Sequence, residues 1–247
     1  MTLQEFFTEH PQAALGCSGG VDSSYLLWAA VNAGADIAPY YIQTAFQPAF
    51  ELEDAQRLCA QIGVKLNVIR LDALADPRVA ANPANRCYYC KVGLFGALRA
   101  RAKADGYDLL LDGTNASDDA GDRPGMKALR EMEVRSPLRE CGLTKAMIRQ
   151  ESRKAGLFTW DKPAYACLAT RVPTGRTITS ELLRRVEGAE TALFALGFTD
   201  FRVRLYGEAA RLQLLEGHLA KAVEQRQAIR QALAPWFDVV LLDTQTR

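Results

Sequence analysis

Residues 18–23 read Ser-Gly-Gly-Val-Asp-Ser, between the apolar run 13–17 and a second apolar run, 25–31. This order predicts a buried strand, a glycine-rich turn and a helix. Glycines let the backbone approach an anion closely, and the first amides of a helix have no acceptor within the helix. We therefore expect a phosphate-binding loop at this turn, although a glycine-rich turn with no ligand is the simpler alternative.

The loop differs from that of Walker-type nucleotide enzymes. No lysine follows Gly20, and the pattern G-x-x-x-x-G-K-[ST] is absent from the chain, which argues against a Walker-type kinase or GTPase. Asp22 is suited to holding Mg²⁺ against a pyrophosphate. The sequence S-G-G-x-D-S at a strand-to-helix turn resembles the ATP-pyrophosphatase superfamily, whose members cleave ATP between the α and β phosphates and adenylate a substrate. The residues expected to bind ATP here are Ser18, Gly19, Gly20, Val21, Asp22 and Ser23.

Composition favours small-molecule chemistry. Thirty basic residues against 29 acidic ones give a net charge of +1, so we expect no nucleic-acid partner. Residues 2–10 are polar and acidic rather than signal-like, and no apolar run approaches the length of a membrane span, so we expect a cytoplasmic protein without a membrane partner. Six cysteines in such a protein are expected to be thiols, metal ligands or catalysts rather than disulfides.

The first part of the chain alternates strand-like and helix-like segments, the pattern of parallel βαβ units. Glycines follow three of the expected helices at positions suited to C-caps. We predict an α/β fold with a doubly wound parallel sheet, like the adenine nucleotide alpha-hydrolases, over residues 1–160. The expected strands are 13–17, 37–44, 66–71 and 109–112, and the expected helices are 22–33, 52–62, 90–105 and 144–155.

The remainder, residues 161–247, is expected to be a smaller α+β domain for sulfur transfer and substrate binding. Residues 179–196 read as an amphipathic helix, and residues 201–205 and 210–214 alternate polar and apolar side chains as in a hairpin. A helix over 220–233 and a strand over 238–243 complete it.

A second polar loop directly follows the fourth expected strand. Residues 112–119 read Asp-Gly-Thr-Asn-Ala-Ser-Asp-Asp and would lie at the same sheet edge as the phosphate loop. We expect Gly113, Thr114 and Asn115 to contact the nucleotide, whereas the alternative is a sequence merely rich in turn formers.

Two cysteine-containing segments narrow the family. Residues 86–91 read R-C-Y-Y-C-K, and residues 163–171 carry P-x-x-x-C-L-A-T-R. With S-G-G-V-D-S, D-G-T-N at 112–115 and R-P-G at 123–125, they resemble the LarE family, the ATP-dependent sulfur transferases of nickel-pincer cofactor synthesis. The resemblance runs from about residue 15 to 214. The family usually has Ser where this chain has Thr170.

The resemblance implies that Cys167 delivers sulfur, in one of two ways. Where the family's cysteine stands alone, it gives up its own sulfur and is left as dehydroalanine. Where a C-x-x-C is also present, the three thiolates of Cys87, Cys90 and Cys167 would hold a 4Fe-4S cluster whose open iron carries an extra sulfur atom. By itself a C-x-x-C also fits half a zinc site or a redox pair, but zinc needs a further ligand and the only histidines, His10 and His218, lie in unsuitable contexts.

Basic side chains accompany the cysteine. Arg171, four residues after Cys167, is expected to lower the thiol pKa and to neutralise the adenylate phosphate. Arg202 and Arg204 alternate on one expected strand and so share a face suited to phosphate or carboxylate. The resemblance also matches Glu190 to a family carboxylate near the site, although surface arginines and helix-surface acids are common.

Taken together, these patterns predict an AMP- and pyrophosphate-forming sulfur transferase that uses ATP and Mg²⁺. Its expected substrate, implied by the resemblance, is a pyridinium carboxylate mononucleotide that becomes a thiocarboxylate, and the resemblance also implies a homo-oligomer. Two other readings stay open: a tRNA- or nucleoside-modifying enzyme of the same superfamily, and a non-catalytic nucleotide or redox sensor.

Overall fold

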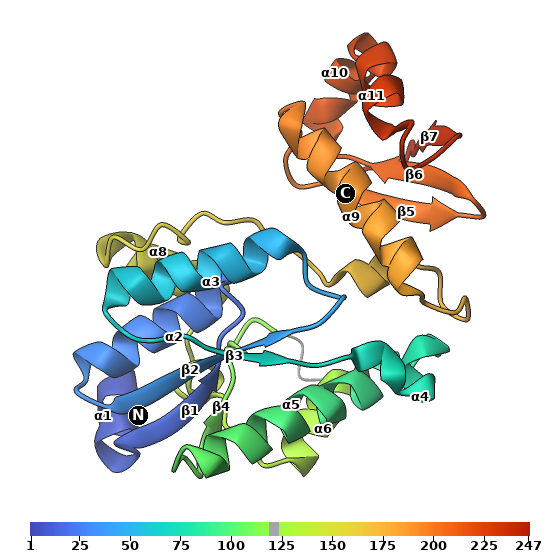
Figure 1. The fold of residues 1–247 in the computed structure, drawn as a ribbon. Helices are drawn as coiled ribbons and strands as arrows, with labels where there is room; N and C mark the ends of the chain where they lie inside the picture. Colours follow the sequence, from blue (N-terminus) through green and yellow to red (C-terminus); the bar gives the residue numbers. More distant parts are fainter. Residues whose placement is uncertain (119–123) are drawn as a thin grey trace. The chain divides into compact units, whose positions relative to one another are not determined.

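The computed structural model describes residues 1–118 and 124–247. Asp119 of the second polar loop and Arg123 of the R-P-G motif lie outside the described residues. The described chain divides into two compact units, one of Met1–Ala73 with Asn85–Lys162 and one of Leu74–Ala84 with Pro163–Arg247. Figure 1 shows both units.

The first unit is built on a parallel sheet with strand order β3-β2-β1-β4. The strands are β1 (Gln12–Gly16), β2 (Asp36–Gln43), β3 (Asn67–Arg70) and β4 (Leu110–Leu111). β1 lies between β2 and β4, with Ala14 paired to Ala38 on one side and to Leu110 on the other. Because the winding direction reverses beside β1, the loops after β1 and β4 flank the switch point where ligands bind in such sheets. The predicted doubly wound α/β class is confirmed.

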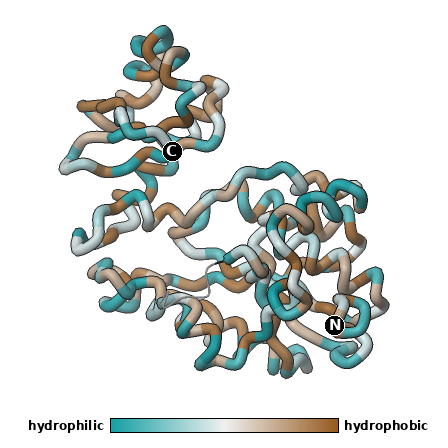
Figure 2. Tube along the Cα trace, turned by 180° about the vertical axis from the view of Figure 1, so that it is seen from behind, coloured by the Kyte–Doolittle hydropathy of each residue, from teal (hydrophilic) through white to brown (hydrophobic). Residues whose placement is uncertain are grey.

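Helices cover both faces of this sheet (Figure 1). On one face, Leu15 of β1 packs in a core with helices α1, α2, α3, α7 and α8, whereas on the other face Ala14 packs with α5 and α6. Alternate residues of a strand point to opposite faces, so one strand supplies both cores. Along these helices the tube of Figure 2 changes repeatedly between hydrophilic and hydrophobic residues, as expected for helices with one buried side. The helices are α1 (Leu3–Glu9), α2 (Val21–Asn32), α3 (Ala49–Ile62), α5 (Arg86–Ala104), α6 (Pro124–Glu131), α7 (Pro137–Glu140) and α8 (Lys145–Lys154).

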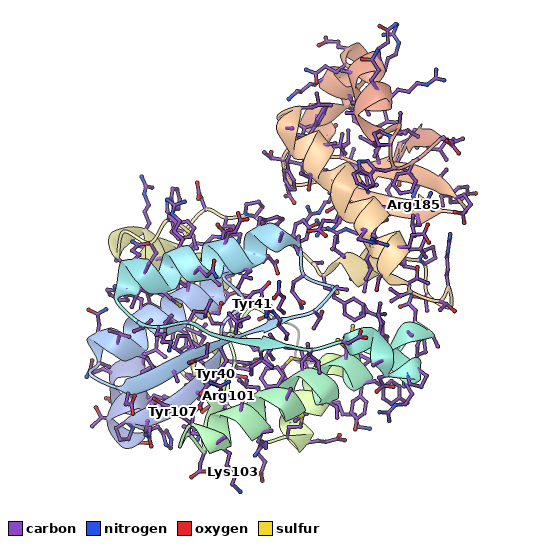
Figure 3. The ribbon with its side chains drawn as sticks, viewed as in Figure 1. Tyr40, Tyr41, Arg101, Lys103, Tyr107 and Arg185 are labelled. Carbon is purple, nitrogen blue, oxygen red and sulfur yellow. The ribbon has the colours of Figure 1, made fainter. Side chains whose placement is uncertain are left out.

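A polar network ties the end of α5 to the sheet. The hydroxyl of Tyr40 and the Nε of Arg101 both donate to Asp105, at 2.8 and 2.7 Å, and the hydroxyl of Tyr107 donates to Asp36 at 2.9 Å. Figure 3 shows the labelled side chains of Tyr40, Arg101 and Tyr107 gathered at this end of the unit. Burial raises the pKa of Tyr40 far above its usual range, and the neighbouring Asp105 raises it further.

The second unit is a small α+β fold, as predicted. Its sheet has the order β5-β6-β7, with β5 antiparallel to β6 and β7 parallel to β6. The residues expected to form one helix over 220–233 form two, because the backbone leaves helical geometry at Gln225. The elements are α4 (Pro77–Ala80), η2 (Leu168–Arg171), α9 (Ser180–Ala195), β5 (Arg202–Tyr206), β6 (Ala209–Gln213), η3 (Glu216–His218), α10 (Leu219–Glu224), α11 (Arg226–Leu233) and β7 (Val240–Leu242); a further short turn, η1 (Ala73–Ala75), spans the unit boundary.

The sequence did not predict that a segment from the first half of the chain belongs to the second unit. Leu74–Ala84 lies within the first half of the chain but packs with the second unit. The Asn82 side chain donates to the carbonyl of Pro173 at 2.9 Å, its carbonyl accepts from Gly175 N at 2.8 Å, and Ile178 N donates to Ala80 O at 2.8 Å. These bonds fix the segment to the turn that follows η2. The main division falls at Lys162, beside the expected boundary of 160.

Within the described ranges, no helix is long and apolar enough to span a bilayer.

Candidate active site

The loop between β1 and α2 presents the start of a helix at the switch point of the sheet. Gly20 is the N-cap of α2, and because glycine has no side chain, the first amides of the helix have no side-chain cap. The serine hydroxyls of this segment bond within it: Ser23 Oγ lies 3.1 Å from Ser18 Oγ, and Ser24 Oγ donates to Gly20 O at 2.7 Å. Ser18 N and Gly20 N also donate to serine hydroxyls of the loop, at 3.2 and 3.3 Å, so these bonds fix its shape. The uncapped first amides of α2 are the groups suited to binding phosphate.

Two glycines allow this loop to pack tightly. Gly19 has a φ of +69°, and a Cβ added there would lie 3.0 Å from both the backbone N of Ala55 and the backbone O of Glu51 on α3. A Cβ added to Gly113 would lie 3.0 Å from the backbone N of Ser23. The structure therefore brings together the two loops that the sequence assigned to the nucleotide, and a side chain at either glycine would force its neighbour to shift.

Asp22 lies in the first turn of α2 with only one of its oxygens engaged. Its Oδ2 accepts from Lys145 Nζ at 2.5 Å, while its Oδ1 is buried and has no hydrogen-bond partner in the described part of the chain. Burial raises the pKa of the Asp22 carboxyl, and Lys145 opposes that rise. A buried carboxylate oxygen left without a partner fits a Mg²⁺ ion, which is usually bound by one or two carboxylates together with substrate phosphates.

The sequence did not single out the cations around this loop. Besides Lys145, Lys162 Nζ donates to Gly19 O at 3.2 Å and pairs with Asp54. Arg149, one helical turn after Lys145, holds the segment that carries Lys162 by donating to Trp160 O at 2.7 Å and to Lys162 O at 2.8 Å. The partners of Lys145 and Lys162 lie more than 100 residues away in sequence, so no local motif reveals these contacts. The one available signal was a lysine at the start of α8, where acidic side chains are favoured.

The polar loop after β4 is held by its own side chains. Thr114 donates through its backbone N at 3.2 Å and its hydroxyl at 2.5 Å to Asp112, which also accepts from Ser136 at 2.6 Å. The buried Asn115 accepts from Ser117 N at 2.8 Å. These bonds make a defined turn beside the phosphate loop. The expected nucleotide contacts of Gly113, Thr114 and Asn115 stay a prediction.

Both cysteines of the C-x-x-C lie on α5, which begins at Arg86, whereas the expected helix began at Cys90 and left Cys87 before it. Three residues apart, Cys87 and Cys90 share one face of the helix, and both reach solvent. Arg86, beside them, is buried with its guanidinium 5.5 Å from the ring of Phe46. All six cysteines lie in the described ranges as thiols, and Cys17 and Cys59 are buried, as expected of core residues.

In the second unit, Cys167 begins the short turn η2. Its carbonyl accepts from Thr170 N at 3.0 Å and from the Thr170 hydroxyl at 2.8 Å, and its side chain is partly exposed. The hydroxyl that Thr170 shares with the serine usual at this position is therefore used to hold the turn. Cys167 is therefore a partly exposed cysteine on a hydrogen-bonded turn.

Arg171 and Glu190 form a buried ion pair behind that turn. The Nε and Nη2 of Arg171 donate to Glu190 at 2.8 and 3.1 Å, and its Nη1 donates to Ala166 O at 3.0 Å. Glu190 also accepts from Val203 N at 2.9 Å and from the hydroxyl of Tyr165. In the structure this pair links the Cys167 turn to α9 and β5. Direct contact of either residue with the adenylate stays a prediction.

The arginines of the hairpin are crowded. Arg202 is 7% exposed and has no ion-pair partner among the described residues, and burial, reinforced by Arg171, lowers its pKa to about 10. Arg204 faces Arg211 directly across the two strands, although like charges in that position repel. Arg204 donates to Gln213 at 3.0 Å and to Thr170 O at 2.8 Å. This excess of positive charge beside the Cys167 turn fits an anionic ligand.

A metal cluster is not assembled within either unit. The described residues contain no group of three or more His, Cys, Asp or Glu side chains that could hold a metal ion. Cys87 and Cys90 belong to the first unit and Cys167 to the second, so three cluster thiolates would have to come from both units.

Known proteins resemble the chain along most of its length. A protein from Lactiplantibacillus plantarum named pyridinium-3,5-bisthiocarboxylic acid mononucleotide synthase is 29% identical over 245 residues, 98% of this chain and 89% of that protein. An uncharacterized protein from Synechocystis sp. is 41% identical over 215 residues, 86% of this chain and 80% of that protein. An uncharacterized protein from Methanocaldococcus jannaschii is 28% identical over 227 residues, 92% of this chain and 86% of that protein. No family model matches the chain.

Proposed function

We propose that this chain is a LarE-family enzyme, an ATP-dependent sulfur transferase of nickel-pincer cofactor biosynthesis. Its substrate would be a pyridinium carboxylate mononucleotide, which it adenylates and converts to a thiocarboxylate. The similarity to a pyridinium-3,5-bisthiocarboxylic acid mononucleotide synthase supports the substrate class. The observation that carries the ATP-dependent step is the phosphate loop at the switch point, with the half-engaged carboxylate of Asp22 in the first turn of its helix.

The first half-reaction would occur at this loop. A substrate carboxylate oxygen attacks the α-phosphorus of ATP, the bond from that phosphorus to the bridging oxygen breaks, and pyrophosphate leaves. The amides at the start of α2 would bind phosphate oxygens, aided by the positive end of the helix. Asp22 would hold Mg²⁺, whose charge stabilises the departing pyrophosphate.

The second half-reaction would use Cys167. Its thiolate attacks the acyl carbon, the bond from that carbon to the AMP oxygen breaks, and AMP leaves. Loss of the Cα proton and cleavage of the Cβ–Sγ bond would then release the thiocarboxylate and leave dehydroalanine. Arg202 and Arg204 would bind the phosphate of the mononucleotide, because their unneutralised charge lies beside the Cys167 turn.

A 4Fe-4S cluster is the other source of sulfur that the family suggests. The thiolates of Cys87, Cys90 and Cys167 have the right chemistry as ligands, and a cluster with three protein ligands would supply sulfur without consuming Cys167. Neither unit contains all three of these cysteines.

Self-association is proposed as well. β7 lies at the edge of the second sheet, and its side chains Leu241 and Leu242 are 38% and 42% exposed. Exposed apolar strand edges favour pairing with another chain. Light scattering of the purified protein would test this.

The function is tested by incubating the protein with ATP, Mg²⁺ and nicotinate mononucleotides carrying one or two carboxylates. We expect AMP and pyrophosphate in equal amounts and a thiocarboxylate product. Dependence on tRNA instead would favour the nucleic-acid-modifying reading, and ATP binding without turnover would favour the sensor.

The source of the transferred sulfur is then identified from the mass of the protein and from its iron and sulfide content. A loss of about 34 Da at Cys167 after turnover indicates transfer of its own sulfur. Iron and acid-labile sulfide in anaerobically purified wild type, but not in Cys87→Ser, indicate the cluster. Absence of both from the wild type removes the cluster and leaves the sacrificial route.

A further inference from the structure

Two arginines of the second unit hold the segment that leads into the proposed sulfur-delivering cysteine. This segment, residues 163–167, forms no helix or strand, so no regular backbone hydrogen bonding fixes it. Arg171 Nη1 donates to Ala166 O at 3.0 Å, and Arg247 Nη2 donates to Ala164 O at 3.2 Å. The two guanidinium groups therefore bind alternate carbonyls of the chain directly before the cysteine.

Arg247 reaches this segment from the second sheet. After β7 the chain continues beside β6, where Asp243 N donates to Leu212 O at 2.9 Å and Arg247 N donates to Leu214 O at 3.0 Å. The Arg247 side chain, 23% exposed, also pairs with Asp200, which precedes β5. Its backbone is therefore anchored to the sheet, and its guanidinium joins the turn before β5 to the segment before η2.

This position is electrostatically unfavourable for a cation. Burial lowers the pKa of the Arg247 guanidinium, and the positive charge of Arg171 lowers it further, whereas Glu190 opposes the fall. Repulsion between two guanidinium groups costs stability. Stability alone therefore does not account for an arginine here, and the hydrogen bond that it donates to the segment before the cysteine is the feature that needs a function.

We propose that Arg247 is a positioning residue for sulfur delivery: by holding Ala164 O, it fixes the backbone before Cys167 for attack on the acyl carbon. This inference rests on the proposed sulfur-transfer function. The backbone after the cysteine is already held, because Thr170 donates to the Cys167 carbonyl at 3.0 and 2.8 Å. Arg247 and Arg171 supply the restraint on the preceding side. Such a restraint matters because a displacement of about 1 Å can slow a reaction about 100-fold.

The first test measures thiocarboxylate formation in a single turnover, with ATP, Mg²⁺ and a nicotinate mononucleotide at saturation. Arg247→Met should form the product about tenfold more slowly than wild type, because one of the two held carbonyls is released. ATP–pyrophosphate exchange and the substrate concentration for half-maximal rate should stay unchanged, since neither depends on the position of the thiol. Arg247→Lys, which keeps the charge and an N–H donor, should recover part of the rate.

The matched control is Arg226→Met on α11. Arg226 is exposed and also donates to a backbone carbonyl, that of Val223 at 3.3 Å, so its variant should react at the wild-type rate. Three results would overturn the inference alone: equal rates for Arg247→Met and wild type, an equal fall in exchange and product formation with a lower thermal midpoint, or a change in half-maximal substrate concentration only. Failure of the wild type to form AMP and pyrophosphate would overturn the proposed function as well.

The second test follows backbone hydrogen exchange of residues 164–167 by mass spectrometry. Exchange there should be faster in Arg247→Met than in wild type, because the segment loses a restraint, while exchange in α9 should not change. Arg226→Met should match the wild type throughout. Unchanged exchange at 164–167 in Arg247→Met would show that Arg247 does not hold the segment, and so would contradict the assignment whatever the rate.

Discussion

Arg171 and Glu190 form a bidentate ion pair with both side chains almost completely buried, at 0% and 1% exposure. The pair lies directly behind the turn that carries Cys167, and Glu190 also accepts the backbone N–H of Val203 at the start of β5. A helix, a strand and the reactive turn therefore share one carboxylate. The ion pair therefore joins the turn that carries Cys167 to α9 and β5.

Glu190→Gln should destabilise the protein strongly. The substitution leaves the Arg171 guanidinium buried without its counter-charge, and breaking a buried pair in this way costs about 3–5 kcal/mol. The denaturation midpoint of the second unit measures the loss. The double variant Arg171→Met/Glu190→Leu should recover part of it, because no charge is then left unpaired; equal loss in both variants would contradict this assignment.

Gly19→Ala should abolish ATP binding and lower the thermal midpoint. The added Cβ would meet the backbone of α3 at 3.0 Å, so the loop must move. Gly34→Ala is the matched control, since Gly34 also has a positive φ, +81°, but nothing lies within 4 Å of an added Cβ. The control should lose about 1 kcal/mol from backbone strain and keep full ATP affinity. If both variants bind ATP normally, the close approach is not needed for the site.

Cys167→Ser should separate the two half-reactions. Adenylation does not need the thiol, so ATP–pyrophosphate exchange should continue with substrate present, whereas thiocarboxylate formation should fall below detection. Cys141→Ser, at a partly exposed cysteine outside the proposed site, should leave both intact. Product formation by Cys167→Ser would remove Cys167 as the site of sulfur delivery.

Alkaline pH should weaken the first unit through Tyr40. Burial raises the pKa of its hydroxyl well above the ordinary value of 10.0, so the unfolded chain ionises first as the pH rises. Because the unfolded state then releases the proton that the folded state retains, stability should fall above about pH 10, by at most about 1.4 kcal/mol per pH unit. Thermal midpoints between pH 9 and 11 should show a smaller fall for Tyr40→Phe than for wild type. Tyr206→Phe, at a tyrosine 62% exposed, should follow the wild type.

Local signals predicted the first sheet well, because strand and helix periodicity and the C-cap glycines all lie within short windows. Gly63, for example, ends α3 in the left-handed conformation that its position implied. The N-terminal boundary of α5 was misjudged by four residues, so both cysteines of the C-x-x-C lie on a helix. Nothing in residues 86–89 marks a strong cap, and Asn85 makes no side-chain cap bond.

Local sequence patterns did not predict contacts between residues that lie far apart in the sequence. The phosphate loop and the Cys167 segment were found from contiguous motifs, but Lys145 meets Asp22 across 123 positions of sequence. The attachment of Leu74–Ala84 to the second unit depends on Asn82, whose partners lie about 90 residues away. The arginines of the hairpin were placed correctly on one face by strand alternation, whereas the burial of Arg171 against Glu190 required the folded chain.

Transfer of a carboxylate oxygen to AMP tests the central claim most directly. If a substrate carboxylate attacks the α-phosphorus and sulfur later displaces AMP at the acyl carbon, a substrate labelled with oxygen-18 in its carboxylate must leave one labelled oxygen on the AMP. Mass spectrometry of the AMP should therefore show a gain of about 2 Da per turnover. Unlabelled AMP, or ADP and phosphate in place of AMP and pyrophosphate, would contradict adenylation at this loop.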